Sequence, residues 1–423
     1  MSAKVLGIAG TMCGCVREVE ALLSGRTGGT GQYPDPVFRR PYTFVIGVAV
    51  AAGMVAVLGA LWLDLPIRDP DGVAGPSYIR LPAIVLIALA ADIVPRAWYR
   101  TPKMVNFFST AGVIIRERWT WARVRLVIIG LGCFYLSYVS YRNIKSFLPF
   151  VNSNLHDDFL GDLDRWMLFG NRPAVVLHDL LGVGFSAHLL SSVYVFYLLF
   201  VPISLAVALV WSRDVRKGFW YVTALSLNWV LGAASYYILP SLGPAYAQPS
   251  DFTMLPDTGV AALQESLLMG RYAVLTDPHA TSSVHGIAAF ASLHVSVVVT
   301  AALIAHRLGM PRWIRVALWA YTGFTVLATV YFGWHYVADD VAGVVIGYLS
   351  VALGAMATGH SMWSLRRIPD EDPEEDAASG TGQGGEPDSS VVTSGAPQPP
   401  SGDGSASGSG SGTSASPPSR SPE

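Results

Sequence analysis

Long apolar stretches separated by short polar segments dominate the chain up to about residue 360. A bilayer core requires about 20 apolar residues per helix, and eight stretches match or approach that length. They are Tyr42 to Leu63, Leu81 to Val94, Val124 to Tyr141, Ala187 to Trp211, Phe219 to Leu239, Ile287 to Ala305, Trp313 to Tyr331 and Tyr336 to Ala357. This pattern predicts an all-α polytopic membrane protein with about eight transmembrane helices.

Basic residues lie at every second boundary between these stretches. Since Lys and Arg are enriched in short cytoplasmic loops, we expect both termini in the cytoplasm, in a multi-pass protein of the plasma membrane. Residues 64–80, 142–186, 240–286 and 332–335 then face the extracytoplasmic side. Residues 102–122 carry four charged side chains, which predicts an interfacial amphipathic helix. From about Pro369 the chain is rich in Gly, Ser, Pro and acidic residues, which predicts a disordered tail.

The composition agrees with a membrane protein. Of the 423 residues, 52% are apolar and 14% are charged, whereas soluble domains are roughly 25% charged. The mean hydropathy is +0.42. Three cysteines are too few for a disulfide framework, and the Cys13 and Cys15 pair lacks the further ligands of a zinc site. The N-terminus has no signal-peptide pattern, so we expect membrane entry through the spans themselves.

A histidine and an aspartate lie four residues apart where the last apolar stretch begins. In a helix, His335 and Asp339 share one face, and a carboxylate at membrane depth needs a partner. We expect Asp339 to accept a hydrogen bond from the His335 ring, which leaves the other ring nitrogen free for nucleophilic attack. Asp340 is expected to be a supporting or solvated group.

A second histidine opens the sixth apolar stretch, also near the predicted outer face. His294 would donate a proton to a leaving oxygen as a general acid. Ser292 would cap its helix and present backbone N–H groups to a phosphate. Two histidines and one aspartate can carry out phosphoryl transfer without a metal. The alternative is that both histidines are interfacial aromatic residues and that Asp339 satisfies one of them.

Four segments together resemble one enzyme family. Ala291-Ser292-Leu293-His294-Val295, followed by residues 329–336 with Asp339 and Gly343, resembles the type 2 phosphatidic acid phosphatase superfamily. Residues 163–173 and 236–244 are similar to the other two signatures of its inositol phosphorylceramide synthase branch. The resemblance covers residues 125 to 357, which include the last six predicted spans.

The resemblance implies a six-helix core in which His335 attacks phosphorus and forms a phosphohistidine. It implies that His294 protonates the leaving alcohol, that Asp339 orients His335, and that neither a metal nor another cofactor is needed. Together with the apolar pattern and the composition, it leads us to expect four parts of the chain. These are a cytoplasmic N-terminal segment (1–41), two additional transmembrane helices with a basic interfacial segment (42–122), a catalytic membrane domain (123–360) and a disordered cytoplasmic tail (368–423).

The chain departs from the family pattern where phosphate is bound. The usual Pro-Ser-Gly-His is Ala-Ser-Leu-His here, Thr329 replaces an arginine, and the Lys and Arg of the first phosphatase motif have no clear counterpart near residues 237–244. We therefore expect Arg271, Arg172 and Ser292 to bind phosphate. Tyr236, Tyr237 and Tyr246 are candidates for a lipid or head-group pocket, although interfacial aromatics need no such role.

The predicted function is a membrane phosphotransferase that acts on a phosphorylated lipid at the extracytoplasmic face. It would pass a phosphoryl or phospho-head group to an alcohol. The alternative is a metal-independent lipid phosphate phosphatase, which would use the same residues. A second alternative is a non-enzymatic transporter or lipid-binding protein, and a vanadate-dependent peroxidase is disfavoured because its basic residues are missing. The expected partners are a phosphorylated lipid and the bilayer, with no nucleic acid.

Overall fold

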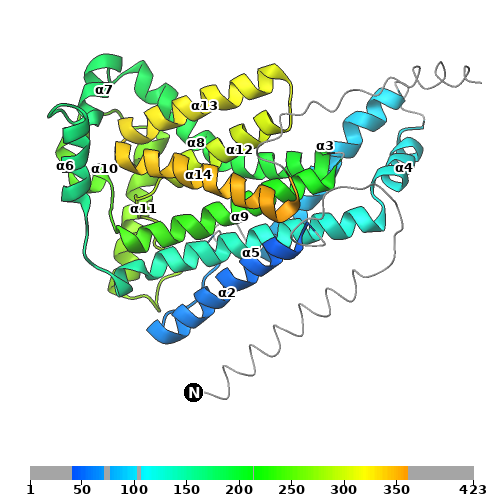
Figure 1. Cartoon of the computed structure of the whole chain (residues 1–423), viewed down its shortest axis with the longest axis horizontal. Helices are drawn as coiled ribbons and strands as arrows, with labels where there is room; N and C mark the ends of the chain where they lie inside the picture. The colour runs from blue at the N-terminus through cyan, green and yellow to red at the C-terminus, as the bar shows by residue number, and fades with distance from the viewer. Residues whose placement is uncertain (1–40, 71–76, 102–105, 213, 361–423) are drawn as a thin grey trace, which may run out of the picture. The chain divides into compact units, whose positions relative to one another are not determined.

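The computed structural model describes residues 41–70, 77–101, 106–212 and 214–360. The predicted N-terminal segment 1–41, apart from its last residue, and the predicted tail 368–423 lie outside this part of the chain. The described residues are helical, with no strand. The helices (Figure 1) are α2 (Thr43–Leu63), α3 (Ser77–Arg100), α4 (Phe107–Arg118), α5 (Trp121–Val151), α6 (Asp157–Met167), α7 (Pro173–Leu181), α8 (Phe185–Ala206) with a π-helical extension (Val207–Trp211), α9 (Val215–Ile238), α10 (Pro244–Ala247), a 3₁₀ turn (Pro249–Phe252), α11 (Gly259–Thr276), α12 (Leu293–Arg307), α13 (Arg312–Tyr331) and α14 (Val337–Thr358).

Every predicted span corresponds to one of these helices, so the protein is an all-α polytopic membrane protein. In the described residues, six helices are long and apolar enough to cross a bilayer, namely α2, α3 from Pro82, α5, α8 with its extension, α13 and α14. The other two predicted spans are α12, which is apolar but only 15 residues long, and α9. The predicted interfacial segment forms α4.

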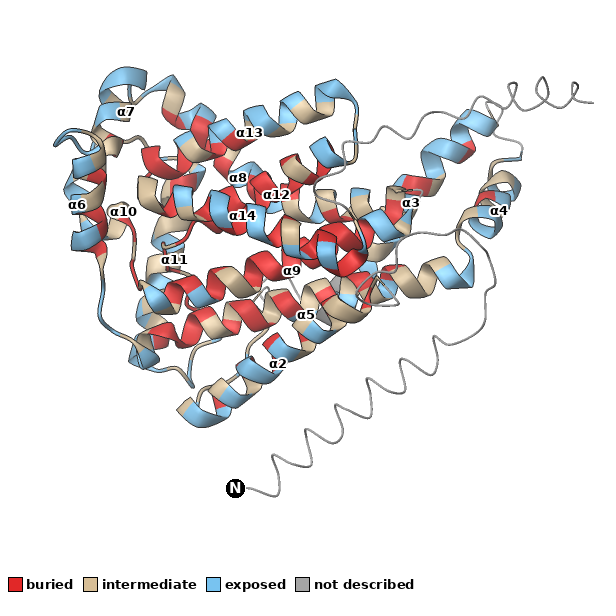
Figure 2. Cartoon of the chain, viewed as in Figure 1, coloured by how far each residue is buried: buried red, intermediate tan, exposed pale blue. Residues whose placement is uncertain are grey.

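Helix α9 lies inside the bundle rather than against lipid. It packs against α2, α5, α12 and α14, and most of its residues are buried (Figure 2). Its polar groups bond to neighbouring helices, since Asn228 donates to Thr300 Oγ1 at 2.9 Å and the Trp220 indole donates to the Val351 carbonyl at 3.0 Å. A helix surrounded by protein can retain such polar residues, which explains why it is not among the apolar spans.

Two predicted boundaries are wrong. The span placed at Ile287 begins as a helix only at Leu293, because the backbone N–H groups before it bond to other elements. Ala289 N–H donates to the Ser241 carbonyl at 2.9 Å, and Ala291 N–H donates to Ser235 Oγ at 3.0 Å. Helix α5 was predicted to end at Tyr141 but continues to Val151, with Lys145 buried inside the protein.

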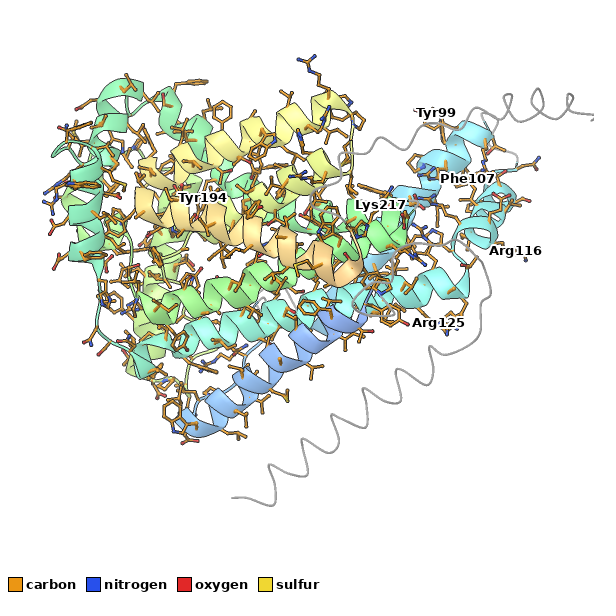
Figure 3. All side chains as sticks on the ribbon, in the orientation of Figure 1. Tyr99, Phe107, Arg116, Arg125, Tyr194 and Lys217 are labelled. Carbon is orange, nitrogen blue, oxygen red and sulfur yellow. The ribbon has the colours of Figure 1, made fainter. Side chains whose placement is uncertain are left out.

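The basic residues of the predicted cytoplasmic loops lie toward the end of the bundle opposite the histidines. Arg125 and Lys145 stand 20 positions apart on α5, which corresponds to about 30 Å along a helix, the thickness of a bilayer core. Figure 3 shows Arg125 and Lys217 far from Tyr194, whose ring packs on His294. This separation agrees with the predicted placement of the two groups at opposite membrane boundaries.

Candidate active site

A short loop between α13 and α14 carries His335. It turns at Gly333, which has a φ of 65°, and a Cβ at this position would lie 2.8 Å from the Ala245 backbone nitrogen and closer still to the Phe252 ring. Only glycine fits this turn. After the loop, Tyr336 N–H donates to Asp339 Oδ2 at 2.9 Å, so the Asp339 carboxylate stabilises the first turn of α14.

The ring of His335 is held by a backbone carbonyl. Its Nδ1 lies 2.9 Å from the Ala289 carbonyl oxygen, whereas Asp339 Oδ2 is 3.5 Å away. The expected hydrogen bond from His335 to Asp339 is therefore replaced by one to Ala289, with the carboxylate next to it. Burial, and secondarily the charge of Lys145, lower the pKa of His335 to about 3. A neutral ring that donates through Nδ1 leaves a lone pair on Nε2.

His294 faces that free nitrogen. Its Nδ1 lies 3.3 Å from His335 Nε2, and its ring packs between Tyr194 and Tyr197, with centroid distances of 4.7 and 4.5 Å. Ser292 is the N-cap of α12 and its side chain accepts from Val295 N–H, which confirms the predicted cap. The structure therefore brings together the two histidines and Asp339, from α12, the 332–336 loop and α14.

Asp340 is buried beside Asp339 and is not solvated. Thr329 Oγ1 lies 2.9 Å from Asp340 Oδ2. Thr329, where the resemblance leads us to expect an arginine, therefore offers this carboxylate a neutral hydroxyl.

Two carboxylates of α6, which the sequence analysis did not assign to the site, hold the His335 loop in place. Asp164 accepts from the N–H groups of Val337 at 2.9 Å and Ala338 at 3.3 Å, the first residues of α14. Asp157 accepts from the N–H groups of Leu242 and Gly243 and lies 3.1 Å from the Tyr336 hydroxyl. Burial raises the pKa of both carboxyls, and these hydrogen bonds partly oppose that rise. A recognisable signal was available, because residues seven apart lie on one face of a helix.

A buried cation, also missed from sequence, adjoins the histidines. Lys145 Nζ lies 3.3 Å from the Ala288 carbonyl oxygen and 4.7 Å from the centre of the Tyr236 ring. It forms no ion pair with a carboxylate among the described residues. Its charge acts on the His335 ring, so an anion entering between the histidines would meet a positive field.

The two arginines expected to bind phosphate lie in different places. Arg172 lines a small cavity with His335 and Tyr336, but its guanidinium is paired with Asp251 at 2.5 Å. Arg271 lies on α11 and contacts the imidazole of His285. Of the three tyrosines, Tyr236 shares a hydrogen bond with Tyr141, Tyr237 donates to Ile144 O, and Tyr246 donates to Gln264 O. These hydroxyls therefore have partners within the protein.

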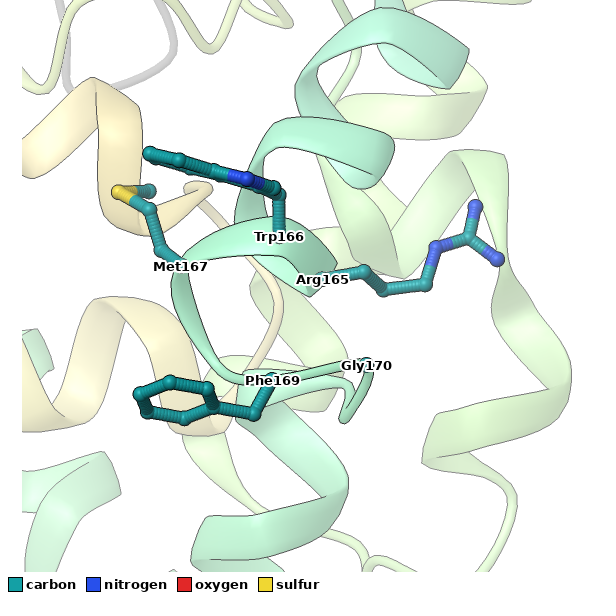
Figure 4. A pocket seen from close by; sticks show the side chains of 5 residues that line it. All are labelled: Arg165, Trp166, Met167, Phe169 and Gly170. Atoms are coloured by element: carbon teal, nitrogen blue, oxygen red, sulfur yellow. The ribbon is translucent and has the colours of Figure 1, made fainter.

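The cavity at His335 is narrow. Its volume is about 20 Å³, which is room for about one water molecule, and His335 is 5% exposed. A wider hollow lies beside the end of α6, where the side chains of Trp166, Met167 and Phe169 extend to one side and Arg165 to the other (Figure 4). Trp166 and Phe169 are 79% and 97% exposed, as aromatic side chains at a membrane interface are. Arg165 lines both spaces.

The comparisons with known proteins bear on this region of the chain. Searches of curated proteins and of solved structures find no match. A family model described as the PAP2 superfamily matches residues 158–353, which run from α6 into α14 and contain both histidines and Asp339. The match is to the superfamily and selects no branch. Members of this superfamily are phosphatases and phosphotransferases that act on lipid phosphates, and the match supports an enzyme of that kind.

Proposed function

We propose that this chain is an enzyme of the PAP2 superfamily that forms a phosphohistidine on Nε2 of His335 when it attacks a phosphorylated lipid. One observation carries the proposal, the 3.3 Å approach of His335 Nε2 to His294 Nδ1 while His335 Nδ1 is bonded to Ala289. The bond to Ala289 fixes the tautomer in which Nε2 can act as the nucleophile. The second imidazole stands where a proton donor is needed.

The two histidines divide the reaction between them. The lone pair of His335 Nε2 forms a bond to phosphorus, and the bond from phosphorus to the leaving oxygen breaks. That oxygen takes a proton from the imidazolium form of His294, which the incoming negative phosphate favours. In the second half, an acceptor hydroxyl gives its proton to His294 and its oxygen attacks phosphorus, which frees His335. Asp339, 3.5 Å from Nδ1, stabilises the positive charge on the phosphorylated ring.

Lys145 is the cation that we assign to the transferred phosphate. It is buried, it has no carboxylate partner in the described residues, and it lies within electrostatic reach of both histidines. The basic phosphate-binding residues of the resembled family have no counterpart at the matching positions of this chain. Lys145 of α5 would bind the phosphate in their place. Ser292 and Arg172 would add donors from the cap of α12 and from the cavity wall.

We assign the reaction to the extracytoplasmic face of the plasma membrane, with an alcohol as the acceptor. The basic boundaries at the opposite end of the bundle support this orientation. The narrow, buried space at His335 supports transfer over hydrolysis, because an enclosed site limits the access of bulk water to the phosphoenzyme. The exposed Trp166 and Phe169 suit contact with the acyl chains of a lipid.

The test is turnover by the purified full-length protein in chelator. Wild type, His335→Asn and the control His306→Asn, at the far end of α12, are incubated with radiolabelled phospholipids and lipid pyrophosphates, with and without inositol. We expect an acid-labile phosphoenzyme and new phosphodiester products in wild type and His306→Asn only. Release of free phosphate alone would establish the phosphatase instead. A function in lipid transport that survives His335→Asn, without any turnover, would favour the non-enzymatic alternative.

A further inference from the structure

A second group of basic side chains surrounds the loop that joins α11 to α12. His285 is fully buried in this loop, and Arg271 of α11 contacts its Nε2. Arg142 of α5 lies beside the next residue, since its Nη2 is 4.0 Å from the position of a Cβ at Gly286. Neither arginine forms an ion pair with a carboxylate in the part of the chain that the structure describes. The loop is therefore surrounded by cations that lack an ion-pair partner in the described residues.

Hydrogen bonding at His285 is incomplete. A neutral imidazole has one acceptor nitrogen, but both ring nitrogens of His285 face donors. Ile287 N–H points at Nδ1 from 3.0 Å, and the Arg271 guanidinium lies against Nε2. Protonation of the ring would remove the one acceptor, and burial with the charges of Arg271 and Lys145 lowers the pKa of His285 to about 3. One donor of this group is therefore left without an acceptor.

Two further donors around the loop lack an acceptor. Arg142 Nε is buried without a hydrogen-bond partner, and so is one terminal nitrogen of Arg68. Arg68 reaches the same loop, because its Nε donates to the Thr281 carbonyl at 3.0 Å. The carboxylate that acts on Arg271 electrostatically is that of Asp157, which already accepts from Leu242 and Gly243. Buried donors normally have partners, so these point to a missing acceptor that carries negative charge.

The loop also connects this group directly to the His335 site. His285 lies four positions before Ala289, whose carbonyl holds His335, and four positions span at most about 14 Å. Lys145 lies between the two groups, since it bonds to Ala288 and acts electrostatically on both His285 and His335. An anion at Arg271 would therefore belong to a molecule that occupies the active site or its immediate entrance.

We propose that Arg271, His285 and Arg142 form a second oxyanion subsite, which binds a phosphate group other than the one attacked by His335. Several acceptor oxygens on one tetrahedral anion would satisfy the unpaired donors and the charge together. The role of this subsite in catalysis rests on the proposed function. Two sources share this chemistry, the second phosphate of a lipid pyrophosphate and the phosphate of a separate molecule.

Binding is measured first, on the purified full-length protein. Isothermal titration with inorganic pyrophosphate and inorganic phosphate compares wild type, Arg271→Gln and Arg271→Lys with the control Arg307→Gln, an exposed arginine at the end of α12. We expect Arg271→Gln to weaken binding of at least one anion about 10- to 100-fold, the usual weight of a charge-assisted hydrogen bond. Arg271→Lys should recover part of the loss. Equal affinity in wild type and Arg271→Gln, or no binding in wild type, would overturn the subsite.

Turnover then separates the two sources of phosphate. A lipid monophosphate and a lipid pyrophosphate with the same chain are compared in wild type and Arg271→Gln. A pyrophosphate source predicts a tenfold or larger loss of kcat/KM on the pyrophosphate alone, about the weight of one charged hydrogen bond. A separate phosphate predicts equal losses on both lipids, and inhibition by inorganic phosphate that Arg271→Gln relieves. Anion binding that depends on Arg271, without any lipid turnover in wild type, would refute the proposed function and leave the subsite standing.

Discussion

Replacing Lys145 with methionine tests whether this buried cation serves the substrate or the fold. The substitution keeps the length of the side chain and removes its charge. If Lys145 binds a phosphate oxygen, the variant loses a hydrogen bond between charged groups, which contributes about 1.5–3 kcal/mol. At 1.36 kcal/mol per factor of ten, kcat/KM should fall about 10- to 150-fold.

Folding stability should respond in a different way. In the described residues, Lys145 makes one long hydrogen bond, 3.3 Å to Ala288 O, and a contact with the Tyr236 ring, and it has no ion pair. These interactions contribute about 1–2 kcal/mol each, whereas burying a charge without an ion-pair partner costs several kcal/mol. Methionine removes the favourable contacts of the ammonium group together with the unfavourable burial of its charge. We therefore expect the unfolding temperature to stay the same or to rise while activity falls.

The assay pairs turnover of a radiolabelled lipid phosphate with thermal unfolding of the same preparation. Lys217→Met is the matched control, because Lys217 is half exposed at the opposite end of α9 and lies 4.0 Å from Asp214. Its turnover should stay within about twofold of wild type, as for most surface substitutions. The reasoning is refuted if Lys145→Met retains wild-type kcat/KM, or if it loses activity only in proportion to lost folded protein.

Three further substitutions address the surroundings of the site. Asp164→Ala should cost about 0.5–2 kcal/mol of folding stability, because it uncaps α14, and should lower kcat. The control Asp162→Ala, on the exposed face of α6, should change neither quantity. Chemical unfolding measures the stability, and turnover of a lipid phosphate measures kcat. Gly343→Ala should reduce both folded yield and activity, because its Cβ would lie 2.4 Å from the Ser292 carbonyl oxygen, whereas Gly323→Ala, with open space around it, should be tolerated in the same thermal assay. The pKa of His285 is lowered to about 3, so its contribution to stability is present above the unfolded value of 6.5 and is lost as the pH falls toward 3, by at most about 1.4 kcal/mol per pH unit. His285→Gln should therefore flatten the fall in unfolding temperature between pH 6.5 and pH 4.5, and an unchanged slope would contradict this assignment.

The spans could be predicted from sequence because a bilayer imposes a length and a composition that few other structures require. All eight predicted stretches are helices, and α4 forms where the charged segment was expected. The error at Ile287 has a physical cause. Residues 287–291 are apolar and mostly buried, as a membrane helix would be, but the backbone N–H groups of residues 289–291 bond to Ser235 and Ser241. Hydropathy records burial and cannot tell which partner satisfies the backbone.

The approach of His294 to His335 could also be expected from sequence, because both were predicted at one membrane boundary. The groups that support them could not. Lys145 was placed without a role in the predicted extracytoplasmic segment 142–186, whereas it lies inside α5 and is buried. Asp164 lies in the family-like segment 163–173, but no role was predicted for it, because its hydrogen bonds to the first turn of α14 depend on how α6 packs there. Such contacts between distant segments depend on tertiary structure rather than on local pattern.

The segment from Ala288 to Ala291 shows why an active-site wall can escape a search for chemical side chains. The Ala288 carbonyl bonds to Lys145, the Ala289 carbonyl holds His335, and the N–H groups of Ala289 and Phe290 are fixed by Ser241. Residues 288–290 make all of these contacts through main-chain atoms. Small apolar side chains let the backbone approach the histidine and lysine closely, so the composition that makes the segment resemble a membrane helix is also what the site requires. Orientation of His335 by a carbonyl leaves the Asp339 carboxylate to cap α14 and to stabilise charge on the ring.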